Sequence, residues 1–211
     1  GLKLNRHELS EHAINIERKR LKEPGGWQDQ IATVYGGLRL IKFKVDGFNV
    51  SANLLNQELS AYLSPRMLLI RTKTLRKNMI SAQANESLVV KGEFVNDIKH
   101  LVKESKIIWN KMKSSSSTKE IYNALSDSLV ISWNYKSKWG SHVLNSEILM
   151  LIERLKDLGV HSYKLIGAGG GGCLLIMANP SIIANVKRNF RPDEIIQFKL
   201  VSEGTSTKSN L

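Results

Sequence analysis

A run of five glycines in six positions, Gly167-Ala-Gly-Gly-Gly-Gly172, constrains this sequence more than any other feature. The run lies between two apolar stretches typical of buried strands, 163–166 and 174–177. Each glycine that is fixed in a fold costs backbone entropy, so the run needs a reason. One interpretation is a floppy turn, although a hairpin needs only one or two glycines. The other is a loop whose bare backbone approaches an anionic ligand or a neighbouring phosphate-binding loop. Spacing alone leaves both open, because the run matches neither the Walker nor the dinucleotide fingerprint.

A second glycine turn, Pro24-Gly-Gly-Trp-Gln-Asp-Gln30, precedes a short helical pattern. An aspartate after such a turn is often only a helix cap. Asp29, however, lies in a group with Trp27, Gln28 and Gln30, side chains that stack on and hydrogen-bond to polyhydroxylated ligands. A carboxylate at the mouth of a helix can also accept a hydroxyl proton as a phosphoryl group arrives. Glu17 lies twelve positions earlier, so a turn could bring both carboxylates to one Mg²⁺ site.

Charge and composition narrow the class of protein. Thirty-one basic and nineteen acidic residues give a net charge of +12, which attracts nucleic acids or phosphorylated small molecules. The basic residues are spread along the chain without an arginine-rich block, which argues against a nucleic-acid surface. The single cysteine, Cys173, excludes an internal disulfide and favours a reducing compartment. No apolar run approaches the roughly 18 residues of a membrane span. We therefore expect a cytoplasmic protein with no membrane partner.

The order of elements predicts an α+β fold. Asn5 with Glu8 and Ser117 with Glu120 predict capping boxes at two helix starts. The residues from 48 to 65 are expected to form an irregular connection, with a domain boundary near Ser64-Pro65. The patterns predict helices at about 6–20, 28–35, 74–86, 94–112, 121–132, 146–158 and 182–190. They predict strands at 38–45, 67–71, 163–166, 174–177 and 195–201.

Taken together, the two glycine-rich motifs resemble the GHMP kinases, a family of small-molecule kinases. The stretch 164–173 looks like the third, C-terminal glycine-rich motif of that family. The stretch 16–37 is most similar to its D-glycero-D-manno-heptose 7-phosphate kinases, with fucokinases close behind. Segments at 68–76, 133–145 and 196–204 agree in order, so the resemblance covers nearly the whole chain.

The resemblance implies a fold and a reaction. Residues 1–64 would be the remainder of a ribosomal-S5-like N-terminal domain, and residues 65–211 a ferredoxin-like C-terminal domain with extra helices. The reaction implied is transfer of the γ-phosphoryl group of ATP, with Mg²⁺, to the anomeric hydroxyl of a sugar or sugar phosphate. Asp29 would be the catalytic carboxylate and Glu17 the Mg²⁺ ligand. The implied substrate-binding residues are Gly25, Gly26, Trp27, Gln28 and Arg76, with Arg71 and Lys73 as further basic candidates. The residues implied beside the nucleotide phosphates are Gly167, Gly169, Gly170 and Gly171.

One departure from the family is large. The Gly-Leu-Gly-Ser-Ser-type nucleotide loop is absent, so the sequence looks like the last two-thirds of such a kinase. A fragment, a truncated frame or one half of a split protein would each explain this, with a missing N-terminal half or a second copy as a possible partner. We expect the isolated chain to bind ATP weakly or not at all. Other GHMP substrates, fucose the nearest, and a noncatalytic sugar- or nucleic-acid-binding remnant stay open. The kinase interpretation predicts that Asp29 and the glycine run meet at a common pocket.

Overall fold

A computed structural model describes residues 4–73, 87, 92 and 94–205 of the chain. These residues form two compact units, one comprising Gly1–Ser60 with Leu200–Leu211 and the other Ala61–Lys199. The domain division predicted after residue 64 lies four residues from the end of Gly1–Ser60. The C-terminal segment, predicted as part of the second domain, belongs instead to the first unit. The predicted helix at 74–86 lies outside the described residues.

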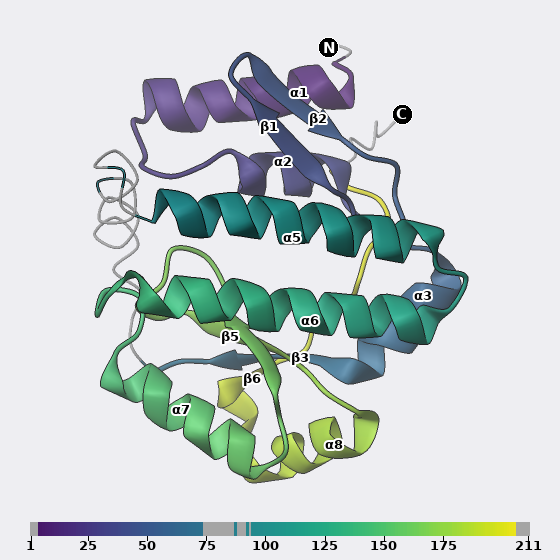
Figure 1. Cartoon of the computed structure of the whole chain (residues 1–211), viewed down its shortest axis with the longest axis vertical. Coiled ribbons are helices and arrows are strands. Elements are labelled where there is room, and N and C mark those ends of the chain that lie inside the picture. Colours follow the sequence, from purple (N-terminus) through teal and green to yellow (C-terminus); the bar gives the residue numbers. More distant parts are fainter. Residues whose placement is uncertain (1–3, 74–86, 88–91, 93, 206–211) are drawn as a thin grey trace, which may run out of the picture. The chain divides into compact units, whose positions relative to one another are not determined.

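The first unit pairs helices with a two-stranded antiparallel hairpin (Figure 1). Its elements are helix α1 (Arg6–Ile14), the π-helix η1 (Asn15–Arg20), helix α2 (Gln28–Tyr35) and strands β1 (Ile41–Lys44) and β2 (Gly47–Val50). Ile14, Ile31 and Phe48 form its buried core. The core therefore ties α1, α2 and the hairpin together.

The predicted helix at 6–20 is present but changes character within its length. The Asn5 side chain accepts a hydrogen bond from the Glu8 amide at 3.0 Å, and the Glu8 carboxylate accepts one from the Asn5 amide at 2.8 Å. This reciprocal capping box, as expected, begins α1. From Asn15 the chain winds as a π-helix, in which the Leu21 amide donates to the Ile16 carbonyl at 2.9 Å. Such wide turns are rare and frequently occur at functional sites.

The second unit is built on a four-stranded antiparallel sheet with the order β4-β5-β3-β6. Its strands are β3 (Met67–Arg71), β4 (Ser162–Leu165), β5 (Cys173–Met177) and β6 (Ile195–Ile196). Its α-helices are α5 (Val95–Ser114), α6 (Thr118–Lys136), α7 (Ser146–Asp157) and α8 (Pro180–Asn189). Short 3₁₀ turns lie at Ser64–Arg66, Ser137–Trp139 and Pro192–Glu194. In the described part of the chain, helices α5, α6 and α7 lie between β3 and β4, and helix α8 lies between β5 and β6. The unit thus has the ferredoxin-like arrangement with extra helices.

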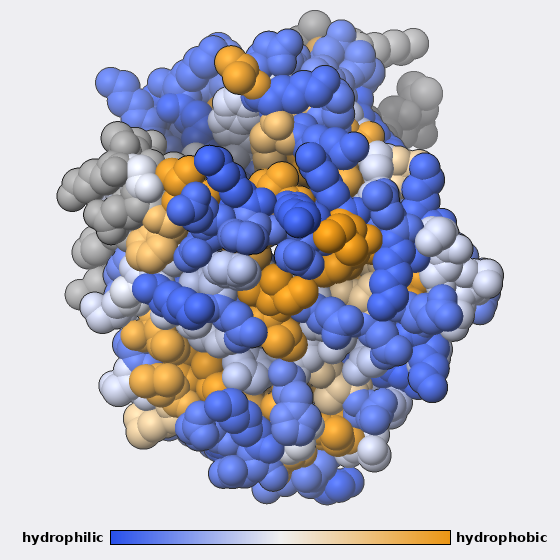
Figure 2. Space-filling view, in the orientation of Figure 1, coloured by the Kyte–Doolittle hydropathy of each residue, from blue (hydrophilic) through white to orange (hydrophobic). Residues whose placement is uncertain are grey.

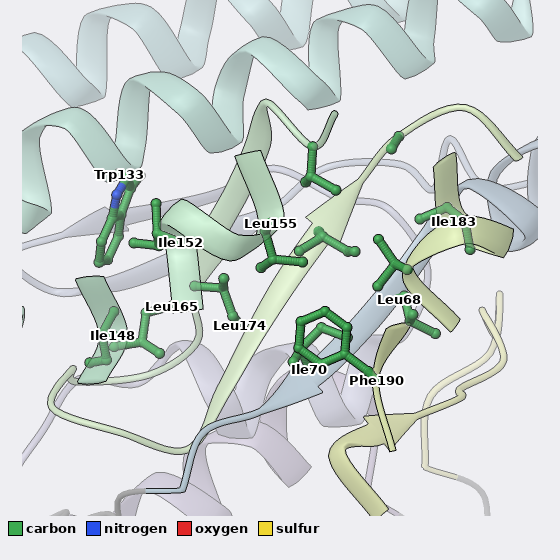
Figure 3. Close-up of a cluster of buried hydrophobic side chains, with 14 of the residues drawn as sticks. Leu68, Ile70, Trp133, Ile148, Ile152, Leu155, Leu165, Leu174, Ile183 and Phe190 are labelled. Atoms are coloured by element: carbon green, nitrogen blue, oxygen red, sulfur yellow. The ribbon is translucent and has the colours of Figure 1, made fainter. Parts of the chain in front are cut away.

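One face of this sheet carries the main hydrophobic core. Leu68 pairs with Ile176 and Ile70 with Leu174, so their side chains share a face, and all four are buried. Helices α7 and α8 lie on the same side of the sheet and contribute apolar side chains to this cluster, among them Ile152, Leu155 and Ile183 (Figures 1 and 3). The packing fixes the strands from which the glycine-rich loop departs.

Helices α5 and α6 form a long antiparallel pair (Figure 1). The capping box predicted at Ser117 forms only in part: its hydroxyl accepts a hydrogen bond from the Glu120 amide at 3.4 Å, but the Glu120 carboxylate accepts from the Ser115 hydroxyl instead of the Ser117 amide. Along α6, the ring of Trp133 makes an edge contact with Tyr163 of β4, their centroids 6.3 Å apart. Helix α6 therefore lies against the edge strand of the sheet, which protects that edge from pairing with another chain.

Two predicted stretches are wrong. Residues 48–65 are not an irregular connection, because they contain most of β2 and helix α3 (Gln57–Leu63). The predicted strand at 195–201 is limited to two residues, since β3 pairs only with Ile195 and Ile196. No described helix is both long enough and apolar enough to cross a membrane. Hydrophilic side chains cover most of the face seen in Figure 2, with apolar residues in separate patches.

Candidate active site

A cavity of about 370 Å³ opens in the first unit between α1, η1 and α2. Its lining contains both apolar and polar residues. The residues lining it are Leu9, Ala13, Glu17, Asp29, Gln30, Thr33, Val34 and Thr205. Both carboxylates predicted from the sequence thus face one cavity, although twelve positions separate them in the chain.

Glu17 lies in the π-helix η1, and donors occupy both oxygens of its carboxylate. Oε2 accepts a hydrogen bond from the side-chain amide of Gln30. Oε1 lies 3.1 Å from a guanidinium nitrogen of Arg18. An ionised carboxylate has about four lone-pair positions, so each oxygen keeps one for a further ligand. Arg18 and Gln30 therefore hold the Glu17 carboxylate in one orientation without exhausting its capacity to bind.

Arg18 also fixes the glycine turn that precedes α2. Its guanidinium donates to the carbonyl oxygens of Glu23, Pro24 and Gly26, each at 2.7 Å. The planar fork of arginine suits several acceptors at once, which a lysine ammonium cannot match. Gly25, with φ +127°, lies against this guanidinium, because a Cβ there would come within 3.3 Å of it. The turn is thus held by the helix that carries Glu17.

Asp29 is exposed in the first turn of α2. The backbone N–H groups of a helix N-terminus favour a negative charge there. The Asp29 backbone carbonyl accepts a hydrogen bond from the Thr33 hydroxyl at 2.8 Å, and its carboxylate accepts none from the described residues. Trp27 precedes the helix and contacts Phe43 edge-on, with ring centroids 6.5 Å apart. Gln28 folds over Gly26, since a Cβ on that glycine would fall 2.2 Å from its Oε1.

The oxygen donors of this cavity fit Mg²⁺. Mg²⁺ prefers oxygen ligands and is commonly held by one or two carboxylates together with substrate phosphates. Glu17 and Asp29 supply two carboxylates to the cavity. Among the described residues there is no cluster of three or more histidines, cysteines, aspartates or glutamates. The donor set therefore suits a cation shared with a phosphorylated ligand better than a closed metal site.

The glycine-rich loop lies in the second unit, between β4 and β5. Gly167, Gly169, Gly170 and Gly172 have positive φ angles between +76° and +118°. At Gly169 a Cβ would come within 2.9 Å of the Val143 Cα, so a side chain there would collide with backbone. Gly169 and Gly171 are buried. These glycines meet conformational and steric demands of the fold, which argues against a floppy turn.

Four residues from three other segments hold this loop. Thr72 exchanges backbone and hydroxyl hydrogen bonds with Gly172 at 2.8 to 3.2 Å. The Gly170 amide donates to the Val143 carbonyl at 3.0 Å, and the Asn145 side chain donates to the Gly170 carbonyl at 3.1 Å. The Lys136 ammonium donates to the Gly167 carbonyl. None of these contacts was predicted as part of a site. Three of these residues, Lys136, Val143 and Asn145, lie in the stretch 133–145, which was noted only for its resemblance to the family.

The remaining predicted residues lie apart from the cavity or outside the described chain. Arg76 falls outside the described residues. Arg71 is exposed at the end of β3, and the Lys73 amide donates to the Glu147 carboxylate. Asp29 and the glycine-rich loop belong to different units, and their meeting at a common pocket stays a prediction.

Known proteins resemble both units. Residues 117–194 match the family described as GHMP kinases C terminal. The chain is 26% identical over 211 residues to a D-glycero-alpha-D-manno-heptose 7-phosphate kinase of Campylobacter jejuni, covering 98% of this chain and 60% of that protein. Its fold is similar to the crystal structure of a D-glycero-D-manno-heptose 1-phosphate kinase from Bacteroides thetaiotaomicron, with TM-score 0.61, 20% identity, and coverage of 96% of this chain and 55% of that one. A mevalonate kinase of Methanococcus jannaschii gives TM-score 0.59 at 16% identity, covering 94% and 57%. The chain thus spans less than two-thirds of each of these relatives.

Proposed function

We propose that this chain, which contains a GHMP kinase C-terminal domain at residues 117–194, serves an ATP-dependent kinase reaction on a hydroxyl group of a sugar phosphate. The observation that carries the proposal is that Glu17 and Asp29 line one cavity. Heptose-phosphate kinases are among the relatives, which supports a sugar phosphate as the acceptor and its anomeric hydroxyl as the reacting group.

In this proposal Asp29 acts on the acceptor hydroxyl. Its carboxylate orients the hydroxyl and accepts its proton while the oxygen forms a bond to the γ-phosphorus of ATP. The bond from that phosphorus to the bridging oxygen breaks in the same step, and ADP leaves with the bridging oxygen. Asp29 suits this role because it lines the cavity and its carboxylate oxygens accept no hydrogen bond from the described residues around it.

Glu17 would hold Mg²⁺, kept in orientation by Arg18 and Gln30. The cation would neutralise charge that develops on the transferred phosphoryl group and on the leaving ADP. Trp27, Gln28, Gly25 and Gly26 would shape the sugar pocket. Gly167, Gly169, Gly170 and Gly171 would lie beside the nucleotide phosphates, where their lack of side chains permits close approach.

The test is the substitution Asp29→Asn in the protein as it is made in the cell. Transfer of radiolabelled γ-phosphate from ATP to D-glycero-D-manno-heptose 7-phosphate is expected to fall by about a hundredfold or more, the usual contribution of a general base. Binding of the sugar phosphate, measured by calorimetry, is expected to change little. Asp46→Asn, at an exposed position in the β1-β2 turn, is the matched control and should retain full transfer. Full transfer by Asp29→Asn would overturn the proposed role.

A further inference from the structure

The segment 201–205 follows the second unit along the chain but belongs to the first unit, beside the end of α2 (Figure 1). The Gly37 amide donates to the Val201 carbonyl at 3.0 Å, and the Thr205 amide donates to the Thr33 carbonyl at 3.0 Å. The last carbonyl groups of a helix have no hydrogen-bond donor within that helix. The segment therefore supplies a donor to the helix that carries the proposed catalytic carboxylate.

Two glycines allow this segment to lie directly against α2. A Cβ on Gly204 would fall 2.0 Å from the Val34 carbonyl oxygen, and a Cβ on Gly36 would fall 2.4 Å from the Glu203 carbonyl carbon. A side chain at either position would therefore push the two backbones apart. The Glu203 carboxylate also forms an ion pair with Arg6 of α1. The segment is thus fixed to α1 and α2, both of which line the cavity.

The last residue of the segment reaches the candidate active site. Thr205 lines the cavity together with Glu17, Asp29 and Thr33. Its hydroxyl donates to the Thr33 carbonyl at 3.2 Å, and the Thr33 hydroxyl donates to the Asp29 carbonyl at 2.8 Å. The segment and the proposed catalytic residue are thus connected through Thr33.

We infer that Thr205 is a positioning residue for the acceptor sugar phosphate, because it holds the C-terminal half of α2 where that helix lines the cavity. The inference rests on the proposed function and adds the segment 201–205 to its binding site. Asp29 lies in the first turn of α2, whereas Thr205 holds the helix farther along, at Thr33. Loss of the contact should therefore weaken binding of the acceptor and leave the transfer rate at saturating acceptor nearly unchanged.

Calorimetry of D-glycero-D-manno-heptose 7-phosphate with the 211-residue chain, below the melting temperature of every variant, measures the affinity. Thr205→Val removes the hydroxyl but keeps the amide and the volume, and should weaken binding about threefold to tenfold. Thr205→Ser keeps the hydroxyl and should bind like the unaltered chain. Gly204→Ala displaces the segment from α2 and should weaken binding about tenfold or more. Ser202→Ala is the matched control, since Ser202 contacts Asn53 through its carbonyl.

Amide hydrogen exchange gives a readout that a merely structural role would not move. Saturating sugar phosphate should slow exchange of the Thr205 amide in the unaltered chain, because the acceptor then lies against the part of α2 to which this amide donates. Exchange within α8, in the second unit, should stay the same.

An affinity of folded Thr205→Val or Gly204→Ala equal to that of the unaltered chain overturns the inference. Equal weakening by Thr205→Ser and Thr205→Val, a lower transfer rate without a lower affinity, or unchanged exchange of the Thr205 amide also overturns it. All of these outcomes leave the proposed function standing, since Asp29→Asn tests that function separately. Failure of the unaltered chain to bind the sugar phosphate overturns both.

Discussion

At the scale of single residues, Arg18 joins the carboxylate of Glu17 to the glycine turn before α2. We predict that Arg18→Lys lowers the free energy of unfolding by about 2 kcal/mol, because one ammonium cannot replace a fork that reaches three carbonyls. Chemical denaturation followed by circular dichroism measures the change. Arg20→Lys, at an exposed position two residues on, should be neutral. Equal stability of the two variants would show that the fork contributes nothing.

Gly169 tests the steric demand on the glycine-rich loop. Gly169→Ala combines a positive φ with a Cβ 2.9 Å from the Val143 Cα, so we expect a loss of about 3 kcal/mol in unfolding free energy. Gly47→Ala serves for comparison, since its φ is also positive but its Cβ would meet nothing within 4 Å. That variant should lose only about 1 kcal/mol. Thermal and urea unfolding of both variants measure the contribution of the clash itself.

At the scale of elements, Asn145 links α7 to the glycine-rich loop. Its Oδ1 accepts from the Ile148 amide at 3.0 Å and caps α7, while its Nδ2 donates to the Gly170 carbonyl. Asn145→Asp should keep the cap, lose the tether and cost about 1 kcal/mol in unfolding free energy, whereas Asn145→Ala loses both and should cost about 2 kcal/mol. Asn5→Asp is the control: asparagine and aspartate both cap α1, so the unfolding free energy should not change. Equal stability of Asn145→Asp and the unaltered chain would refute the tether.

The elements that could be predicted are those with strong local signals. The capping residues Asn5 and Ser117 begin helices as expected, and the apolar run 67–71 is a strand. The π-helix was not predictable, because the apolar pattern of a helix does not report its hydrogen-bond spacing. Strand β2 was missed because it is four residues long and has polar neighbours on both sides. The end of β6 is set by how far β3 extends beside it, which is a tertiary constraint.

Part of the candidate site was equally accessible from the sequence. Asp29 and Glu17 were proposed from residue type, spacing and the family resemblance, and both line one cavity. Gln30 was expected only as a group that hydrogen-bonds to a ligand, and Arg18 was not identified, because their contacts with Glu17 form only after folding. The same holds for Thr72, whose hydroxyl reaches a glycine 100 positions away. Sequence patterns report periodicity and composition, and they do not report such pairings.

At the scale of the whole molecule, stability should depend on pH through Lys164. Burial lowers the pKa of its amine, so the folded state holds the charged form at a cost. Between the lowered pKa and the usual value near 10.5 the unfolded state binds more protons, and stability rises with pH. Lys164→Met should therefore be about 1 kcal/mol more stable at pH 7, with a melting temperature about 2–4 °C higher. The difference should shrink as the pH approaches 10.5.

Calorimetric melting across this pH range provides the measurement. Lys187→Met on α8, where the lysine is exposed, should leave the pH profile unaltered. An advantage of Lys164→Met that stays constant between pH 7 and the alkaline limit would contradict the assignment to a desolvated amine.

The π-helix makes the candidate active site sensitive to deletions as well as to substitutions. Successive side chains of a regular α-helix are rotated by about 100° about the helix axis. Deleting one residue from Asn15–Arg20 would therefore rotate all the side chains on one side of the deletion relative to those on the other. Glu17 would then no longer face Gln30, or Arg18 would no longer face the glycine turn to which it donates hydrogen bonds. A single-residue deletion in this short segment could thus destroy the site in a related sequence. The side chains that form the site could all still be present but would no longer point to the same cavity.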